Sequence, residues 1–265
     1  MSPDSDWQPD ARRRRLLAAL PDAPRWVEAR ALLVTEWATL REDAGAGASA
    51  SAGEAVDGRR DPAVPAFVLT DPFAGLAIVC GQPAATLIAP MPPAVGEVIA
   101  YPDNVDRVRA ALPGWSAQAV RVRVLDEASG AGAGEPTHAV ALIDPRRGAD
   151  LPGVPAALRE ELLGVVADGL PLAAAFDGAR AVAFCHPAAC SGRYWDLAID
   201  TVASHRRRGY AQAAVRFMVG HMRRSAGLEP VWCDPDSNPG SARLAQRLGF
   251  VETDRIWLLS PSRGA

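Results

Sequence analysis

The chain contains no lysine, and its 28 basic residues are all arginine. A lysine Schiff base and the Gly-Lys-Ser/Thr phosphate loop of many nucleotide-binding proteins are therefore excluded. An excess of positive charge is missing as well, because 31 acidic residues leave a formal net charge of −3. A general nucleic-acid-binding protein usually carries a strong basic excess, so the charge balance argues against that class.

Long apolar runs are also missing. No segment approaches the roughly 20 apolar residues that a membrane-spanning helix needs. Pro21 interrupts the apolar stretch after Arg12–Arg15 before it reaches the length of a signal peptide. We therefore expect a soluble, cytoplasmic protein with no membrane partner. For the four arginines, a solvated helix face is favoured over an RNA-binding or acidic-surface contact.

Cysteine is scarce, with four residues in 265. This is too few for a disulfide framework in a chain of this length. Cys185, His186 and Cys190 lie close together, but their spacing matches no common zinc pattern. We therefore expect buried thiols and no bound metal.

Two low-complexity stretches divide the chain, at residues 42–61 and 127–136. Both consist of small residues and cannot support a core, which is typical of linkers. The second stretch predicts a boundary between an N-terminal α/β domain over 1–126, with a structural or substrate-shaping role, and a second domain over 137–265. In the first domain, Trp26, Ala29, Leu33 and Trp37 recur at helical spacing, which predicts a helix over 25–41.

The pattern in the second domain alternates strands and helices. Leu158, Leu162 and Val165 predict a helix over 154–168, and Asp177-Gly178 predicts a hairpin turn between two strands. A long helix is expected to begin after Gly209 and to end at Gly227, with its apolar face formed by Ala211, Val215, Met218, Val219 and Met222. Asn238 with Pro239 predicts the start of a short helix. The expected strands cover 66–71, 75–81, 97–102 and 119–126 in the first domain, and 137–144, 171–178, 179–187, 193–202, 229–234 and 249–260 in the second.

The stretch Ser204–Val215, with the sequence SHRRRGYAQAAV, joins the strand over 193–202 to the long helix. The first turn of a helix has unpaired N–H groups and a partial positive charge, so it favours a bound phosphate. Gly209 allows a close approach of the backbone, and the arginines add positive charge around it. We therefore expect a pyrophosphate site here, with His205 on the surface beside it.

Arg206-x-x-Gly209-x-Ala211 resembles the pyrophosphate motif Gln/Arg-x-x-Gly-x-Gly/Ala of the GNAT N-acetyltransferase superfamily. A second block, Asn238-x-x-Ser241-x-x-Leu244 followed by Leu248-Gly249-Phe250, resembles the superfamily's Asn-x-x-Ala-x-x-Leu…Gly-Phe block. The resemblance covers about residues 137–259. It implies a mixed, mostly antiparallel central sheet flanked by helices, preceded by a smaller α/β domain that is either independent or a diverged copy of the same fold.

The resemblance also implies a ligand, acetyl-CoA, and the residues that hold it. The backbone amides from Arg207 to Gln212 would bind the pyrophosphate, and the strand edge from Ile199 to Thr201 would pair with the pantetheine arm beside a bulge. The implied cofactor-binding residues are Ile199, Thr201, Arg206, Arg207, Arg208, Gly209, Tyr210, Ala211, Gln212, Asn238 and Ser241.

The implied reaction transfers an acetyl group from acetyl-CoA directly to an amine of a small molecule or a protein. Asp196 and Asp200, four residues apart on one strand, are the candidates for the general base. Asp234 and Asp236 are the next candidates. The tyrosine that usually protonates the leaving thiolate is replaced by Ala245. This departure leaves an alternative open, in which the chain is a catalytically weak or inactive acyl-CoA-binding module.

Overall fold

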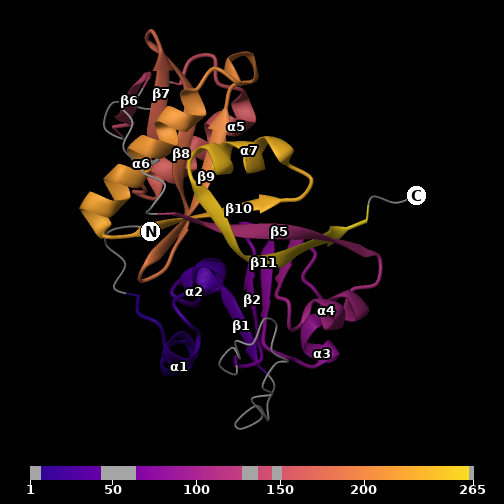
Figure 1. Ribbon diagram of the computed structural model, residues 1–265. Helices are drawn as coiled ribbons and strands as arrows, with labels where there is room; N and C mark the ends of the chain where they lie inside the picture. The colour runs from indigo at the N-terminus through magenta and orange to yellow at the C-terminus, as the bar shows by residue number, and fades with distance from the viewer. Residues whose placement is uncertain (1–6, 43–63, 127–136, 145–150, 263–265) are drawn as a thin grey trace. The chain divides into compact units, whose positions relative to one another are not determined.

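A computed structural model describes residues 7–42, 64–126, 137–144 and 151–262 (Figure 1). These residues form two compact units. Unit 1 comprises Arg123–Trp232 and Gly240–Val251. Unit 2 comprises Trp7–Val122, Cys233–Pro239 and the chain from Glu252 onward. The low-complexity stretches lie outside the described residues, apart from Glu42.

The sheet of unit 1 is built mainly from hairpins. The strands β6 to β9 follow one another in space as in sequence, and each pairs antiparallel with the next. β9 pairs on its other side with β10, which runs parallel to it. Beyond β10 the order continues with β5 and β11. The strands wholly in unit 1 are β6 (Ala139–Leu142), β7 (Ala173–Asp177), β8 (Arg180–Cys190) and β9 (Tyr194–Thr201), and those divided between the units are β5 (Trp115–Leu125), β10 (Glu229–Pro235) and β11 (Phe250–Pro261).

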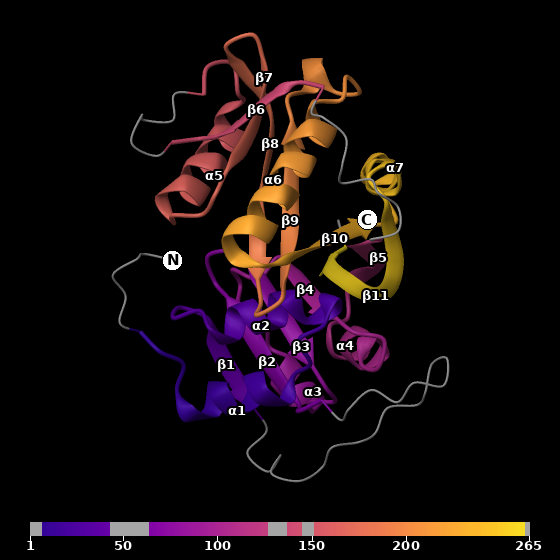
Figure 2. The same ribbon diagram turned by 60° about the vertical axis from the view of Figure 1, so that its left-hand side comes forward.

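Two helices cover opposite faces of this sheet. α6 (Tyr210–Ala226) packs against Ala173, Ala175 and Cys185, and α5 (Ala156–Ala167) packs with Ala174 and Phe184 (Figure 2). Successive strand residues point to opposite faces, so the alternation between the two clusters places the helices on different sides. The predicted apolar stripe of α6 is confirmed by its buried side chains, among them Val215, Met218, Val219 and Met222.

α6 ends where the sequence predicts it to end. Gly227 adopts a φ of 67°, and its N–H donates to the carbonyl of Arg223 at 3.2 Å. This left-handed cap suits glycine because it has no Cβ to clash. The remaining helix of unit 1, α7 (Pro239–Arg247), begins at the predicted proline and contributes Leu244 and Ala245 to the same core as α6.

The strands of unit 2 also combine antiparallel and parallel pairing. β1 (Thr39–Glu42), β2 (Phe67–Asp71) and β3 (Leu76–Cys80) pair antiparallel in sequence order. β3 pairs parallel with β4 (Glu97–Ala100), which pairs antiparallel with the last part of β11. A core of Val68, Val79, Val98 and Leu259 lies between these strands and the helices α3 (Ala85–Ile88) and α4 (Val105–Ala111).

The first helical segment of unit 2 differs from the prediction. A short 3-10 turn (Pro24–Trp26) leads into α2 (Val27–Leu33), which ends eight residues before the predicted end of the helix at residue 41. The chain then enters β1, whose Thr39 pairs with Thr70 of β2. Trp26, Ala29 and Leu33 are buried as expected, whereas Trp37 follows the helix and remains 44% exposed. Strand pairing therefore overrides the helical spacing of the tryptophans.

The N-terminal arginines lie on α1 (Ala11–Ala19), as expected for a helix face, but they are not all solvated. Arg13 is buried, and its guanidinium donates to the backbone carbonyls of Thr35 and Ala38. Arg15 forms an ion pair with Glu42 at 2.6 Å. Within the described part of the chain, no helix combines the length and the apolar character that a membrane crossing requires.

The mixed, mostly antiparallel sheet with flanking helices confirms the predicted fold class. The boundary between the units, after Val122, lies close to the predicted end of the first domain at residue 126. However, two C-terminal segments, Cys233–Pro239 and the chain from Glu252, group with unit 2 rather than with unit 1. The boundaries after Trp232 and Val251 fall inside the continuous strands β10 and β11. No change in sequence composition therefore marks them.

Candidate functional site

The N-terminus of α6 presents unpaired backbone donors. The helix begins at Tyr210, and no side chain caps it. The N–H of Ala213 donates to the carbonyl of Gly209 at 3.1 Å and is the first to bond within the helix. The preceding amides, from Tyr210 to Gln212, have no intrahelical acceptor, and the helix dipole adds a partial positive charge beside them. This end of α6 is therefore suited to an anion.

The loop before the helix bends sharply at two residues. Arg207 has a φ of 63° and Gly209 a φ of 91°, both in the left-handed region. Glycine adopts this region readily, whereas an arginine there is strained by about 1–2 kcal/mol. Turns of this kind gather successive N–H groups into a concave anion-binding surface. A Cβ on Gly209 would also lie 3.2 Å from Nε2 of His138, which is too close without a shift.

The three arginines of the loop are exposed and available to a ligand. Arg206 donates from Nε to the carbonyl of Thr201 at 3.3 Å. Among the ion pairs of the described residues, none includes Arg206, Arg207 or Arg208. Their positive charge is therefore not neutralised by a neighbouring carboxylate, which favours binding of a multiply charged anion such as a pyrophosphate.

The aromatic rings of His138, His205 and Tyr210 pack together beside the loop. The ring of His138 stacks on Tyr210 with centroids 4.0 Å apart, and His205 meets the same tyrosine edge-on at 5.9 Å. His138 also donates from Nε2 to the carbonyl of Arg208 at 2.8 Å, since a carbonyl can only accept. These contacts hold the loop in one conformation.

Asp177, at the β7–β8 turn, anchors the same group of side chains. Its carboxylate lies 3.3 Å from Nε2 of His205, whose Nδ1 lies 2.9 Å from the hydroxyl of Ser204. His205 is buried, so the prediction of a surface position for it was wrong. Burial raises the pKa of Tyr210, and the charge of Asp177 and its hydrogen bond with the phenol raise it further, while Arg208 acts in the opposite direction. Tyr210 therefore stays neutral at pH 7 and supports the loop.

The strand that leads into the loop has an edge that is only partly paired. The register between β9 and β10 runs from Tyr194 to Asp196 on the β9 side, and β9 continues to Thr201. Ile199 and Thr201 lie on this continuation and are half-buried. The irregularity of this region is on the neighbouring strand β8, between Pro187 and Ala189, rather than at Ile199–Thr201 as the family pattern suggests.

The two predicted base candidates share one face of the sheet. Asp196 lies opposite Ala189 of β8, and Asp200 lies opposite Phe184. Phe184 belongs to the core under α5, so both aspartates are on the α5 side of the sheet. Trp195, the neighbour of Asp196, is fully buried on the α6 side and is a core residue.

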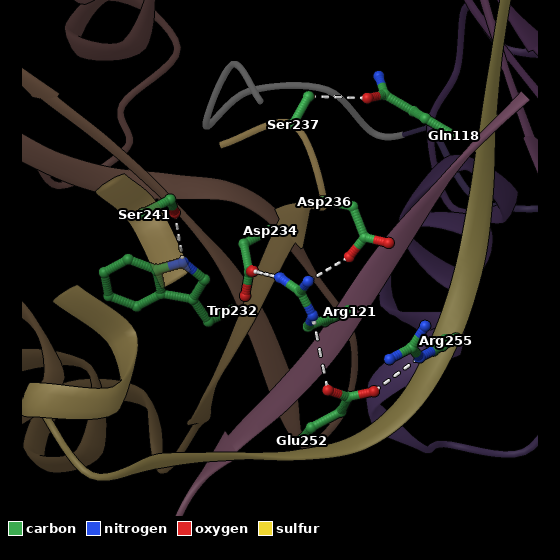
Figure 3. A network of polar contacts seen from close by, with 9 residues as sticks. All are labelled: Gln118, Arg121, Trp232, Asp234, Asp236, Ser237, Ser241, Glu252 and Arg255. Atoms are coloured by element: carbon green, nitrogen blue, oxygen red, sulfur yellow. Dashed lines mark hydrogen bonds and ion pairs between the residues drawn. The ribbon is translucent and has the colours of Figure 1, made fainter. Parts of the chain in front are cut away.

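The second motif block has structural partners. Ser241 accepts a hydrogen bond from the indole of Trp232 at 2.8 Å, which fixes the start of α7 against β10 (Figure 3). Asn238 directly precedes α7, and its N–H donates to the carbonyl of Pro235 at 2.8 Å. Ala245 is fully buried in the core with Leu248 and thus does not offer a polar group. The cofactor-binding roles of Asn238 and Ser241 stay predictions.

Asp234 and Asp236 lie in unit 2 around one arginine. Arg121 on β5 contacts Asp234 at 2.9 Å, Asp236, and Glu252 at 3.7 Å (Figure 3). Arg255 in turn contacts Glu252 at 2.7 Å. Asp234 is fully buried, so its charge requires the neighbouring guanidinium. These acids are therefore held in a structural ion-pair network.

Cysteine and histidine do not form a metal site in the described residues. Cys185 and His186 are consecutive on β8 and point to opposite faces of the sheet. Burial raises the pKa of the Cys185 thiol, which stays protonated. In the parts of the chain that the structure describes, no group of three or more His, Cys, Asp or Glu side chains is arranged to hold a metal ion.

We call the loop Arg206–Gly209, together with the N-terminus of α6, the anion loop. Residues 172–256, which contain the anion loop and both motif blocks, match a family model described as GNAT acetyltransferase. This C-terminal region is thus similar to the GNAT acetyltransferase family, as the two motif blocks indicate. The comparison with curated proteins gave no match.

Solved GNAT-type structures resemble the chain in fold. A GCN5-related N-acetyltransferase-like protein from Streptococcus suis has a TM-score of 0.57 at 15% identity, covering 94% of this chain and 97% of its own. A GCN5-related N-acetyltransferase from Kribbella flavida has a TM-score of 0.57 at 12% identity, covering 93% and 98%. A GNAT-family acetyltransferase from Colwellia psychrerythraea has a TM-score of 0.51 at 13% identity, covering 94% of each chain.

Several residues of the site were missed in the sequence. His138 follows a linker, and Asp177 was assigned only to a hairpin turn, so neither has a local signal that connects it to the loop. Ser204 lies within the quoted stretch, but its contact with His205 depends on the turn between them. His186 was considered only as a metal ligand. The period-2 pattern of β8 would have placed it on the α5 side, together with Phe184.

Proposed function

We propose that the chain is an N-acyltransferase that transfers an acetyl group from acetyl-CoA directly to an amine of a small molecule or a protein. The observation that carries the proposal is the N-terminus of α6. It combines free amides, two left-handed residues and three arginines without a carboxylate partner among the described residues. The arginines offset the negative charge of a pyrophosphate bound there, and the amides donate hydrogen bonds to its oxygen atoms.

Each part of the donor has a matching group in unit 1. The amides from Arg207 to Gln212 bind the CoA pyrophosphate, and the side chains of Arg206–Arg208 add charge around it. The pantetheine arm, which carries amide groups, pairs with the edge of β9 from Ile199 to Thr201, beyond the last β9–β10 pair. This places the thioester near the middle of β9.

The chemistry at that point needs a base. The amine nitrogen attacks the thioester carbonyl after losing a proton, and the CoA thiolate leaves. Asp196 and Asp200 lie on one face of β9 and are the proposed proton acceptors. The thiolate is stabilised by water and by fixed dipoles, because the position of the usual tyrosine is the buried Ala245.

Ala245 also favours a second candidate function, an acyl-CoA-binding module with little or no catalysis. The methyl group of Ala245 is buried in the core and carries no proton donor, so this position cannot protonate the leaving thiolate. The two functions share the anion site and differ only in turnover. Acetylation of any amine by the wild-type protein, lost on substitution of both Asp196 and Asp200, excludes the binding module.

The first experiment is thermal unfolding with acetyl-CoA, CoA, ATP and NAD. A ligand at about 100 times its Kd stabilises the folded state by about 2.7 kcal/mol. We expect acetyl-CoA and CoA to raise Tm by several degrees, whereas ATP and NAD have little effect. A flat response to all four ligands contradicts the proposed function.

Gly209→Glu tests the anion loop, with Gly227→Glu as its matched control. Both glycines have a left-handed φ and lie at the two ends of α6, but only Gly209 faces the proposed phosphate. We expect both variants to lose some stability and only Gly209→Glu to lose the Tm shift with CoA and the acetylation activity. Equal CoA binding by the two variants rules out the loop as the pyrophosphate site.

A further inference from the structure

His186 is a buried histidine on the same face of the sheet as the two base candidates. It lies on β8 opposite Ala198 of β9, and its neighbours along β9 on that face are Asp196 and Asp200. Its side of β8 is the side of Phe184, which packs with α5. His186 is 5% exposed, yet its Nε2 atom has no hydrogen-bond partner among the described residues. Such an atom in a folded protein requires an explanation.

The other ring nitrogen defines the tautomer of His186. Nδ1 lies 3.2 Å from the carbonyl oxygen of Pro187. A carbonyl oxygen can only accept, so Nδ1 carries the hydrogen in this contact. In the neutral ring Nε2 then has a free lone pair. The nitrogen without a partner is therefore a proton acceptor, which is the property that a general base needs.

Two carboxylates lie diagonal to His186 on the neighbouring strand. Asp196 and Asp200 occupy the diagonal positions on either side of Ala198, about 7–8 Å from His186 between Cα atoms in an antiparallel pair. The charged residues of α5, Arg159, Glu160 and Glu161, are exposed, whereas Leu158 and Leu162 face the sheet.

The sheet is irregular at the same place. The register between β8 and β9 shifts between Pro187 and Ala189, which adds the unpaired residue Ala188 two positions after His186. On the other side of β9, the parallel pairing with β10 ends at Asp196. Bulges commonly occur next to active sites, where they redirect a side chain. Both irregularities meet at Asp196, which lies diagonal to His186 across the β8–β9 pair.

We propose that Nε2 of His186 is a further catalytic group of the acetyl transfer and takes the proton from the acceptor amine. This inference rests on the proposed function. The amine N–H bond breaks and its proton moves to Nε2, while nitrogen forms a bond to the thioester carbonyl carbon. The C–S bond breaks, and its electron pair remains on sulfur. The imidazolium then returns a proton to the CoA thiolate, so that acetyl-CoA and amine give acetamide and CoA.

In this arrangement the amine proton goes to Nε2 of His186 instead of directly to Asp196 or Asp200, and the two aspartates act as positioning residues that stabilise the imidazolium. The return of the proton also supplies the acid that the chain lacks at Ala245. One side chain thereby performs both proton transfers, because the nitrogen that accepts the amine proton is the one that returns it.

The test is His186→Gln, with His221→Gln on α6 as the matched control. His221 lies eleven residues after the start of α6, away from the anion loop. Acetyl-CoA binding is measured by Tm shift, and kcat and KM are measured with a panel of primary amines. We expect His186→Gln to bind acetyl-CoA like the wild-type protein and to lose about 100-fold or more in kcat. The fall of kcat/KM at acidic pH, which reports protonation of Nε2, should disappear with it.

The outcomes separate the two proposals. If wild-type protein acetylates amines and His186→Gln keeps kcat within about threefold, the role of His186 is refuted while the proposed function stands. If wild-type protein binds CoA but acetylates none of the amines, the proposed function fails and the role of His186 fails with it.

A second measurement covers the case in which His186→Gln does not fold. Long-range ¹H–¹⁵N correlation spectra of the wild-type protein show the tautomer of each of its four histidines, which are assigned with the variants at His138, His205 and His221. We expect the Nδ1–H form for His186 and a change of its signals when acetyl-CoA is added. An Nε2–H form contradicts the proposal.

Discussion

Arginine serves opposite purposes in the two units of the protein. In unit 1, Arg206, Arg207 and Arg208 surround the N-terminus of α6, and none of them forms an ion pair within the described residues. In unit 2, Arg121 alone is in contact with three carboxylates, Asp234, Asp236 and Glu252. The difference shows that the role of an arginine in this protein depends on the carboxylates that neighbouring strands bring to it.

The physical basis is the cost of burying charge. Asp234 is fully buried and Arg121 is largely buried, so each compensates the other and neither is available to a ligand. Arg206–Arg208 are hydrated, and their attraction to a distant charge is weak. A pyrophosphate bound there accepts hydrogen bonds from several backbone amides and is attracted by three arginines, so many weak interactions add up for one ligand. This makes the loop a binding site and the Arg121 network a structural element.

Arg121→Gln should have the largest effect on stability. It leaves the fully buried carboxylate of Asp234 without its guanidinium, which we expect to lower the free energy of unfolding by about 3 kcal/mol. Urea unfolding followed by circular dichroism measures this change. Arg255→Gln, which removes only the exposed contact with Glu252, is the control and should change it by less than about 0.5 kcal/mol. Similar losses for the two variants contradict the structural role of Arg121.

Replacement of all three loop arginines by glutamine should have an intermediate effect, and on binding rather than on folding. Each exposed charge contact contributes about 0.5 kcal/mol, so the Kd for CoA should rise about tenfold. The loss should shrink at high salt because screening weakens the same contacts. Calorimetric titration at two salt concentrations measures it.

Arg107→Gln combined with Arg109→Gln on α4 is the control for this charge change. Both arginines are exposed in unit 2, so the double variant should bind CoA like the wild-type protein. An equal loss of CoA affinity in the two sets would show that net charge, and not the loop, attracts the ligand.

Arg207→Gly should have the smallest effect, and it should be stabilising. The left-handed φ of 63° strains an arginine by about 1–2 kcal/mol, whereas the greater freedom of glycine in the unfolded chain costs about 0.5–1 kcal/mol. The net gain is about 0.5–1 kcal/mol in the free energy of unfolding. Arg208→Gly, at a residue without a positive φ, should be destabilising instead, and thermal unfolding compares the two.

Much of the fold follows from local pattern in the sequence. The hairpin at Asp177-Gly178, the buried stripe of α6 and its end at Gly227 were predicted because each depends on residues a few positions apart. The helix over 25–41 was wrong beyond Leu33, because the pairing of β1 with β2 involves residues about 30 positions away. The segments of β10 and β11 that join unit 2 were unpredictable for the same reason.

The candidate site likewise has one part that is predictable from local sequence and another that depends on contacts between distant segments. The anion loop is one continuous segment with a glycine, three arginines and a helix start, so its sequence carries its chemistry. His138, Asp177 and His186 come from elsewhere in the chain, and only the packing of β6–β9 against α6 gives them neighbours. The bulge at Ala188 shifts the register of β8, and no spacing in the sequence indicates it.

By itself, the sequence determined that the chain has no lysine chemistry, contains a helix N-terminus suited to a phosphate, and carries two motif blocks of the GNAT superfamily. Tertiary structure alone decided which arginines are neutralised, which residues hold the loop, and that the buried Nε2 of His186 has no hydrogen-bond partner among the described residues. The reason is that the charge and hydrogen-bonding capacity of a side chain are fixed by its type. Whether they are already used depends on groups that folding brings from distant parts of the chain.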